Sequence, residues 1–132
     1  MLSSLPPPSK ALAEVGGASA HVGPGPFTSV VNKNGYTFRF HVAPNQAAVP
    51  NTFAVQISRG GKPVTGADVI LSFAMLDMEM PNQEQHLSER SPGVYGAAAP
   101  TLVMVGHWGL SFAVTPAGGT PVTVLYVDHA TG

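Results

Sequence analysis

The stretch that decides the fold is Gly106-His-Trp-Gly-Leu-Ser-Phe-Ala-Val-Thr115, in which large apolar side chains alternate with small or polar ones. Successive side chains on a β-strand point to opposite faces of a sheet, so an alternation with a period of two is typical of a strand that buries one face. The side chains predicted to point inward are Trp108, Leu110, Phe112 and Val114. We therefore expect a sheet packed against a second layer, with His107 on its outer face.

Similar short runs, separated by turn residues, recur from residue 27 onward. Asn34-Gly35, Ser91-Pro-Gly93 and Pro116-Ala-Gly-Gly119 favour reversals of the chain. The predicted strands cover residues 28–31, 36–43, 52–58, 67–76, 86–90, 94–98, 106–115 and 122–127. Short strands at this spacing, over about 100 residues, are typical of the sandwich fold. The fold class we expect is all-β, an immunoglobulin-like β-sandwich of about seven strands.

Residues 1–26 differ from the rest of the chain because proline and glycine dominate them. Pro6-Pro-Pro8 and Gly23-Pro-Gly-Pro26 are typical of a linker. A short helix at residues 10–15, with Ser9 as its N-cap, is the one regular element predicted there. We therefore expect a linker at residues 1–26 and one sandwich domain at residues 27–132.

Composition excludes several functions. The chain has 6 Lys and Arg against 7 Asp and Glu, and no basic run, so we expect no nucleic-acid partner, because phosphate recognition needs clustered cations. It has no cysteine, which excludes thiolate ligands and thiol nucleophiles. The sequence motifs of serine hydrolases, phosphate-binding loops and zinc proteases are also missing from it. We expect no enzymatic activity.

Three of the five methionines lie in Met75-Leu-Asp-Met-Glu-Met80. Thioethers are soft, neutral donors that suit Cu(I) and do not suit harder ions such as magnesium. Met78 and Met80, joined by Met104 from a later segment, are the leading candidate copper ligands, and Met75 is a candidate for a fourth contact. Gly106 follows Met104 closely and allows another segment to approach the backbone there.

Each of these methionines has an alternative role as a core side chain, because methionine readily fills irregular core space. Met75 shares the parity of the apolar residues before it, which favours the core. On a regular strand Met78 and Met80 point to the opposite face, so a site that uses all three requires an irregular backbone near Asp77. For Met104 both roles stay open.

Two histidines, His86 and His107, are further candidate copper ligands, because imidazole is a common copper ligand. His21 and His129 fall in the predicted linker and in the tail, where we expect no ligand role. A rival site for zinc or manganese would draw its oxygen and nitrogen ligands from Asp77, Glu79, Glu84 and His86.

Several motifs resemble a known family. They are Gly35-Tyr-Thr-Phe38, Gly61-Lys-Pro-Val64, Ala67-Asp-Val69, the methionine run closed by Pro81, Pro92-Gly-Val-Tyr95 and Met104-Val-Gly-His-Trp-Gly-Leu110. In this order they resemble the YtkA-like domain over about residues 35–115. The resemblance implies a small extracytoplasmic β-sandwich associated with copper handling.

The first residues carry a second resemblance. Met1-Leu-Ser-Ser-Leu-Pro-Pro-Pro-Ser9 with Ala11-Leu12 looks like the exit from the last membrane helix of CopD-type copper-resistance or copper-uptake proteins. It implies a preceding membrane segment, with the CopD-type transporter region of the same polypeptide as a partner. It also implies a location in the periplasm or on the outer face of the cell membrane. A periplasmic or extracellular copper-carrying protein is a further expected partner.

The function we expect is copper binding, as Cu(I), for transport or resistance by the attached membrane protein. The alternative is a non-catalytic interaction or scaffold module of the same fold without a metal site. Exposed methionines adapt to protein partners, so the same residues suit that role as well.

Overall fold

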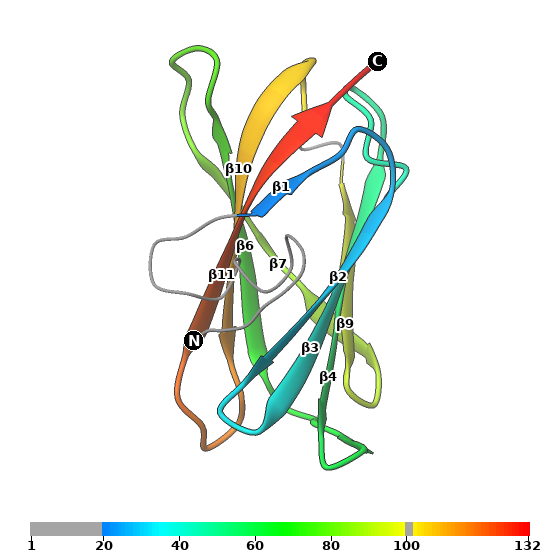
Figure 1. The fold of residues 1–132 in the computed structure, drawn as a ribbon, viewed down its shortest axis with the longest axis vertical. Coiled ribbons are helices and arrows are strands. Elements are labelled where there is room, and N and C mark those ends of the chain that lie inside the picture. The colour runs from blue at the N-terminus through cyan, green and yellow to red at the C-terminus, as the bar shows by residue number, and fades with distance from the viewer. Residues whose placement is uncertain (1–19, 100–101) are drawn as a thin grey trace.

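The computed structural model describes residues 20–99 and 102–132, which form two β-sheets packed face to face (Figure 1). The five-stranded sheet contains, in order, β1 (Ala20–Val22), β11 (Val122–Ala130), β10 (Gly106–Thr115), β6 (Asp68–Met75) and β7 (Gln83–His86). The six-stranded sheet contains β2 (Phe27–Lys33), β3 (Tyr36–Ala43), β4 (Asn51–Arg59), β9 (Val94–Ala99) and β8 (Ser88–Ser91), and β5 (Lys62–Pro63) pairs with β4. The predicted all-β sandwich is confirmed.

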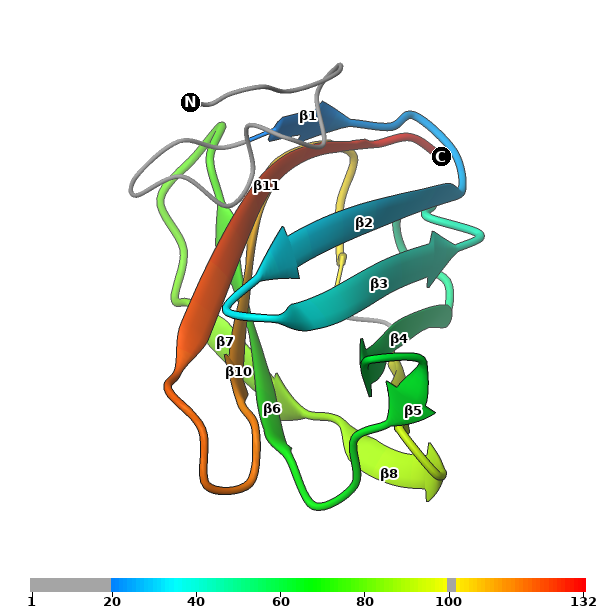
Figure 2. The same ribbon diagram turned by 60° about the horizontal axis from the view of Figure 1, so that its bottom comes forward.

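Alternation along the central strands builds the core. The inward side chains of β10 are all buried, as predicted: Trp108, Leu110, Phe112 and Val114. On the opposite sheet, β3 buries Phe38, Phe40 and Val42 with the same period. The rings of Phe40 and Phe112 lie with their centroids 4.8 Å apart, so side chains from the two sheets meet in the layer between them. Figure 2 shows the two sheets from a second direction. Each fully buried side chain of this size contributes about 1.5–3 kcal/mol.

The single strand predicted at residues 86–90 is wrong, because the chain changes sheets inside it. β7 ends at His86 in the five-stranded sheet, and β8 begins at Ser88 in the six-stranded sheet. Leu87 between them is buried, and its N–H donates to the carbonyl of Val69 over 3.0 Å. The buried Leu87 holds the segment in which the chain passes from the five-stranded to the six-stranded sheet.

Two short segments at the termini differ from the prediction. β1 lies within the predicted linker and pairs in parallel with β11, with Ala20 beside Tyr126. β11 runs to Ala130, three residues past its predicted end at residue 127. His21 and His129 therefore lie on strands, contrary to the expectation that they belong to a linker and a tail.

The helix predicted at residues 10–15 lies outside the described residues, as do the first 19 residues of the predicted linker. No helix among residues 20–99 and 102–132 is long and apolar enough to cross a membrane.

One end of the five-stranded sheet brings Met75 close to the segment that follows Met104. There β6 ends at Met75, β10 begins at Gly106 and β11 ends at Ala130. Trp108 lies in register with Met75 on one side and with Asp128 on the other. The β6–β7 loop extends beyond the sheet at this end, at the upper left of Figure 1.

Candidate metal centre

Met75 closes β6 and lies in the core. Its side chain is 8% exposed and packs in the same cluster as Trp108, its register partner. The alternation along β6 buries every second residue up to this point, which confirms the parity argument that placed Met75 inside. Any thioether donor from this residue would approach an ion from the core side.

The other methionines of the run do not continue the strand. After Met75 the chain bends, so the opposite parity expected for Met78 and Met80 on a regular strand does not apply. Met78 is 53% exposed, whereas Met80 is half-buried and packs against the core. The irregular backbone that a shared site requires near Asp77 is therefore present.

Gly106 is the point at which the two methionine-bearing segments meet. Its φ of +145° is a conformation that other residues rarely adopt. A Cβ atom at this position would collide with Cε of Met75 and lie 2.6 Å from Oδ2 of Asp77. The close approach expected at Gly106 is thus observed, because only glycine leaves room for both side chains.

Met104 precedes this glycine by two residues. Its carbonyl accepts a hydrogen bond of 3.0 Å from Nε1 of the buried Trp108, and its side chain is half-buried against the core. Two residues of chain span at most about 7 Å, so the Cα of Met104 lies within about that distance of the glycine that Met75 contacts. The indole thus fixes the segment that carries Met104 beside the end of β6.

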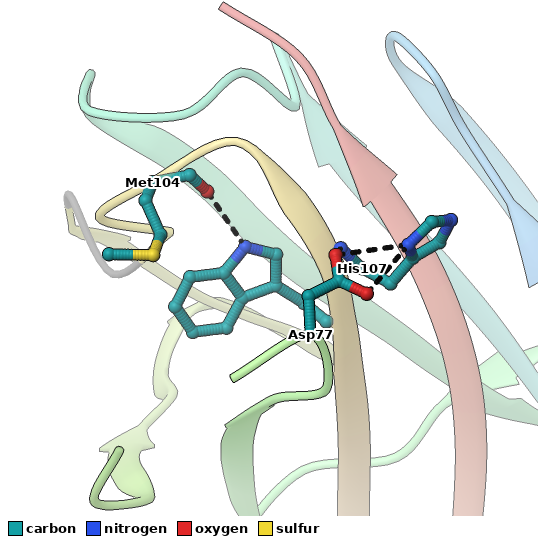
Figure 3. Close-up of polar contacts among 4 residues, drawn as sticks. Asp77, Met104 and His107 are labelled. Atoms are coloured by element: carbon teal, nitrogen blue, oxygen red, sulfur yellow. Dashed lines mark hydrogen bonds and ion pairs between the residues drawn. The ribbon is translucent and has the colours of Figure 1, made fainter. Parts of the chain in front are cut away.

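Asp77 and His107 hold the start of the β6–β7 loop onto β10 (Figure 3). The backbone N–H of His107 donates to Oδ2 of Asp77 over 2.7 Å, and Nδ1 of the same histidine lies 3.1 Å from each carboxylate oxygen. The N–H of Leu76 donates to the carbonyl of His107 over 2.8 Å. The backbone hydrogen bond from His107 is the main cause that lowers the pKa of Asp77, and the side-chain bond and charge of His107 act in the same direction.

His86 lies elsewhere. It pairs with Ile70, five residues before Met75 on β6, which corresponds to about 17 Å along the strand. Its Nε2 lies 3.8 Å from Oδ1 of Asp68, and both side chains are largely exposed. The structure therefore does not bring His86 to the methionines.

The rival zinc or manganese site is not assembled. Glu84 and His86 lie on β7, while Asp77 is bound to β10. Within residues 20–99 and 102–132, no three histidine or acidic side chains are arranged to hold a metal ion.

His129 is a neighbour that the sequence interpretation missed. It lies directly opposite His107 on β11, and the two imidazole rings are stacked with centroids 4.8 Å apart and planes inclined by 16°. Its parity with the half-buried Leu125 and Val127 places it on the outer face of the sheet. Extending the alternation of β11 past residue 127 would have found it.

Fold and site together define a small β-sandwich domain that carries methionines at one end of one sheet. A family model described as YtkA-like matches residues 31–113, more than half of the 132 residues. The chain belongs to the YtkA-like family. Comparison with curated proteins and with solved structures finds no match.

Proposed function

We propose that this domain binds copper as Cu(I), outside the cytoplasm, through methionine thioethers at the end of the five-stranded sheet. The observation that carries the proposal is the meeting of two segments at Gly106, where Met75 packs against the backbone two residues beyond Met104. Membership of the YtkA-like family, which the sequence resemblance associates with copper handling, supports the proposal.

The donor atoms suit Cu(I). Sulfur of methionine is soft and uncharged, which favours Cu(I) over harder ions. Met75 is buried, Met80 and Met104 are half-buried, and Met78 is exposed, so the set runs from the core to the surface. Methionine side chains are flexible, and Met78 and Met80 lie on the β6–β7 loop, so their sulfurs can adjust around an ion. Neutral ligands need no deprotonation, so binding should depend weakly on pH.

The proposed setting is transport or resistance by an attached membrane protein of the CopD type. In that setting the domain is non-catalytic, passes Cu(I) to or from the membrane-embedded region of the same polypeptide, and exchanges it with a periplasmic or extracellular carrier. Partial exposure of the thioethers suits such exchange, because a partner's ligands can reach the ion before it leaves.

A second candidate function, protein interaction without metal, is favoured by the apolar side chains at the same end. Four large hydrophobic residues there are between 43% and 56% exposed: Leu76, Met78, Val103 and Val105. Exposed apolar groups of this kind are typical of surfaces that contact other proteins. The methionines would then provide adaptable contacts and would not act as ligands.

An anaerobic Cu(I) titration in competition with a chromophoric chelator separates the two functions. The test variant replaces Met78, Met80 and Met104 with leucine, which keeps the volume of the side chains but removes the sulfurs. We expect its Cu(I) affinity to fall at least as far as the ~10- to 100-fold typical of losing outer-shell partners of a metal ligand. His86→Ala is the matched control, because His86 is an exposed candidate ligand outside the cluster.

Equal competition curves for the wild type and the triple variant would contradict the thioether site and leave the interaction module as the better account. Circular dichroism of both proteins should superimpose, because the replaced side chains are exposed or half-buried. Labelled methionine methyl groups provide a second measurement: signals from ligating residues should shift on addition of Cu(I), and the signal of Met1 should not.

A further inference from the structure

The outer face of the five-stranded sheet carries two stacked imidazoles with no role in the thioether site. His107 on β10 and His129 on β11 are direct cross-strand partners. Their neighbours on the inner face, Trp108 and Asp128, are fully buried, so the two histidines point away from the core. Cβ atoms of such partners lie about 4.5–5.5 Å apart, which allows both side chains to reach one point above the sheet.

The carboxylate of Asp77 favours the tautomer of His107 whose Nε2 is free to bind a metal. Nδ1 of this ring lies 3.1 Å from both oxygens of Asp77, so in the neutral imidazole the proton sits on Nδ1 and is donated to the carboxylate. Nε2 then keeps its lone pair. Histidines that ligate metals usually donate the other ring N–H to a carboxylate or carbonyl in this way.

The two rings are close enough to share an ion once one of them turns. Their centroids are 4.8 Å apart and their planes are inclined by 16°, so the in-plane lone pairs of the stacked rings run nearly parallel. Binding of one ion at nitrogen bond lengths of about 2.0 Å therefore requires the ring of His129 to rotate out of the stack about its side-chain torsions, while the bonds to Asp77 hold the ring of His107. The half-exposed side chain of His107 leaves the remaining coordination positions to water.

From this geometry we infer that His107 and His129 form a second metal site, for a divalent ion of borderline softness, with Cu(II) bound most tightly. Imidazole nitrogen suits Cu(II), Zn(II) and Ni(II), and the affinity of such sites is highest for Cu(II) in this series. Asp77 acts as the positioning residue. The site lies on the opposite face of the sheet from the core-facing Met75, and it uses no sulfur.

This inference does not rest on the thioether proposal, because the two sites use different donors. Addition of Ni(II) or Zn(II) tests it directly, since neither ion is suited to thioethers. The full chain is titrated with each ion, and binding is followed by nitrogen-detected NMR of the histidine rings. Cu(II) is then added for electron paramagnetic resonance, where two coordinated nitrogens give a characteristic splitting.

Three variants and two controls define the expected result. We expect His107→Ala and His129→Ala each to weaken Zn(II) and Ni(II) binding at least about tenfold, and Asp77→Asn to weaken it about tenfold. The splitting from the second nitrogen should vanish in either histidine variant. The first control is His86→Ala, because His86 also lies near a carboxylate, that of Asp68 at 3.8 Å, but does not face a second imidazole across the strands.

The second control is the triple leucine variant of Met78, Met80 and Met104, which should bind Zn(II) and Ni(II) as the wild type does. Unchanged affinity in His129→Ala would overturn the inference, since this residue takes no part in fixing the β6–β7 loop. Loss of Zn(II) or Ni(II) binding in the triple leucine variant would also overturn it, because the ions would then be using the thioether end.

Discussion

Asn45 and Asp128 share a buried hydrogen bond of 2.7 Å, from Nδ2 of the amide to Oδ1 of the carboxylate. Both residues are fully buried, and Oδ2 of Asp128 has no hydrogen-bond partner among the described residues. Burial raises the pKa of Asp128 to about 6, although the bond from Asn45 opposes this shift. The folded domain therefore favours the protonated form of this one carboxyl group.

The first prediction is that this group makes the domain less stable as the pH rises. Its pKa is higher in the folded state, about 6 against an ordinary value of 3.8, so its stabilising effect is complete below pH 3.8 and is lost as the pH rises through about 6. Between about pH 4 and 7, the free energy of unfolding of the wild type should fall relative to that of Asp128→Asn by on the order of 2 kcal/mol. Urea denaturation of both proteins across this range measures the difference, and parallel pH profiles would contradict it.

The second prediction concerns Gly106, where we expect substitution by alanine to destabilise the domain strongly. The added Cβ atom meets Met75 and Asp77, and the alanine must keep the strained φ of +145°. The combined cost is about 2–5 kcal/mol. Gly118→Ala is the control, because Gly118 also has a positive φ, +70°, but no atom within 4 Å of the added Cβ. It should cost only about 1–2 kcal/mol.

Thermal denaturation of the two alanine variants provides the comparison. Met75→Ala should cost less stability in the Gly106→Ala background than in the wild type, since the collision with the methionine methyl group is then removed. Equal costs at the two glycines would mean that the crowding at Gly106 has no energetic consequence.

The third prediction is that Asp77 titrates below the ordinary range of an aspartate. The backbone N–H of His107 lowers its pKa, so the stabilisation from this group is present above the ordinary aspartate value of 3.8 and is lost as the pH falls through the lowered pKa. The amide signal of His107 in NMR should follow this acid transition. In Asp77→Asn the transition should disappear, and the amides of Leu76 and His107 should exchange with solvent faster at neutral pH.

The fourth prediction uses the single tryptophan of the chain. Nε1 of Trp108 is bonded to the carbonyl of Met104, so Cu(I) bound at that methionine should alter the fluorescence of the domain. We expect a saturable change in emission whose amplitude falls in Met104→Leu. An identical change in that variant would place the ion away from Met104.

Strand alternation predicted much of this fold, and its failures have physical causes. The limits of β3 and β10 match the expected ranges, because their inward residues are apolar without exception. The end of β11 was predicted too early because its fourth inward residue is Asp128, a buried acid that breaks the apolar pattern. β1 was missed because glycine and proline surround it and its pairing partner is more than 100 residues away.

The candidate site was predictable only in part. The sequence indicated that Met75 faces inward and that Gly106 permits a close approach, and both are observed. The hydrogen bonds between Asp77 and His107 were not predicted, since a sequence separation of 30 residues carries no information on contact. The stacking of His129 on His107 depends on the register of β10 against β11, which a sequence pattern does not determine.

The short strands at the two edges of the five-stranded sheet have a consequence for self-association. Free N–H and C=O groups on an edge strand can recruit a strand from another molecule, and short edge strands limit this. β1 has 3 residues and β7 has 4, and they shield β11 and β6, which have 9 and 8. Truncation through residue 22 would expose the edge of β11 and should promote concentration-dependent dimers or aggregates.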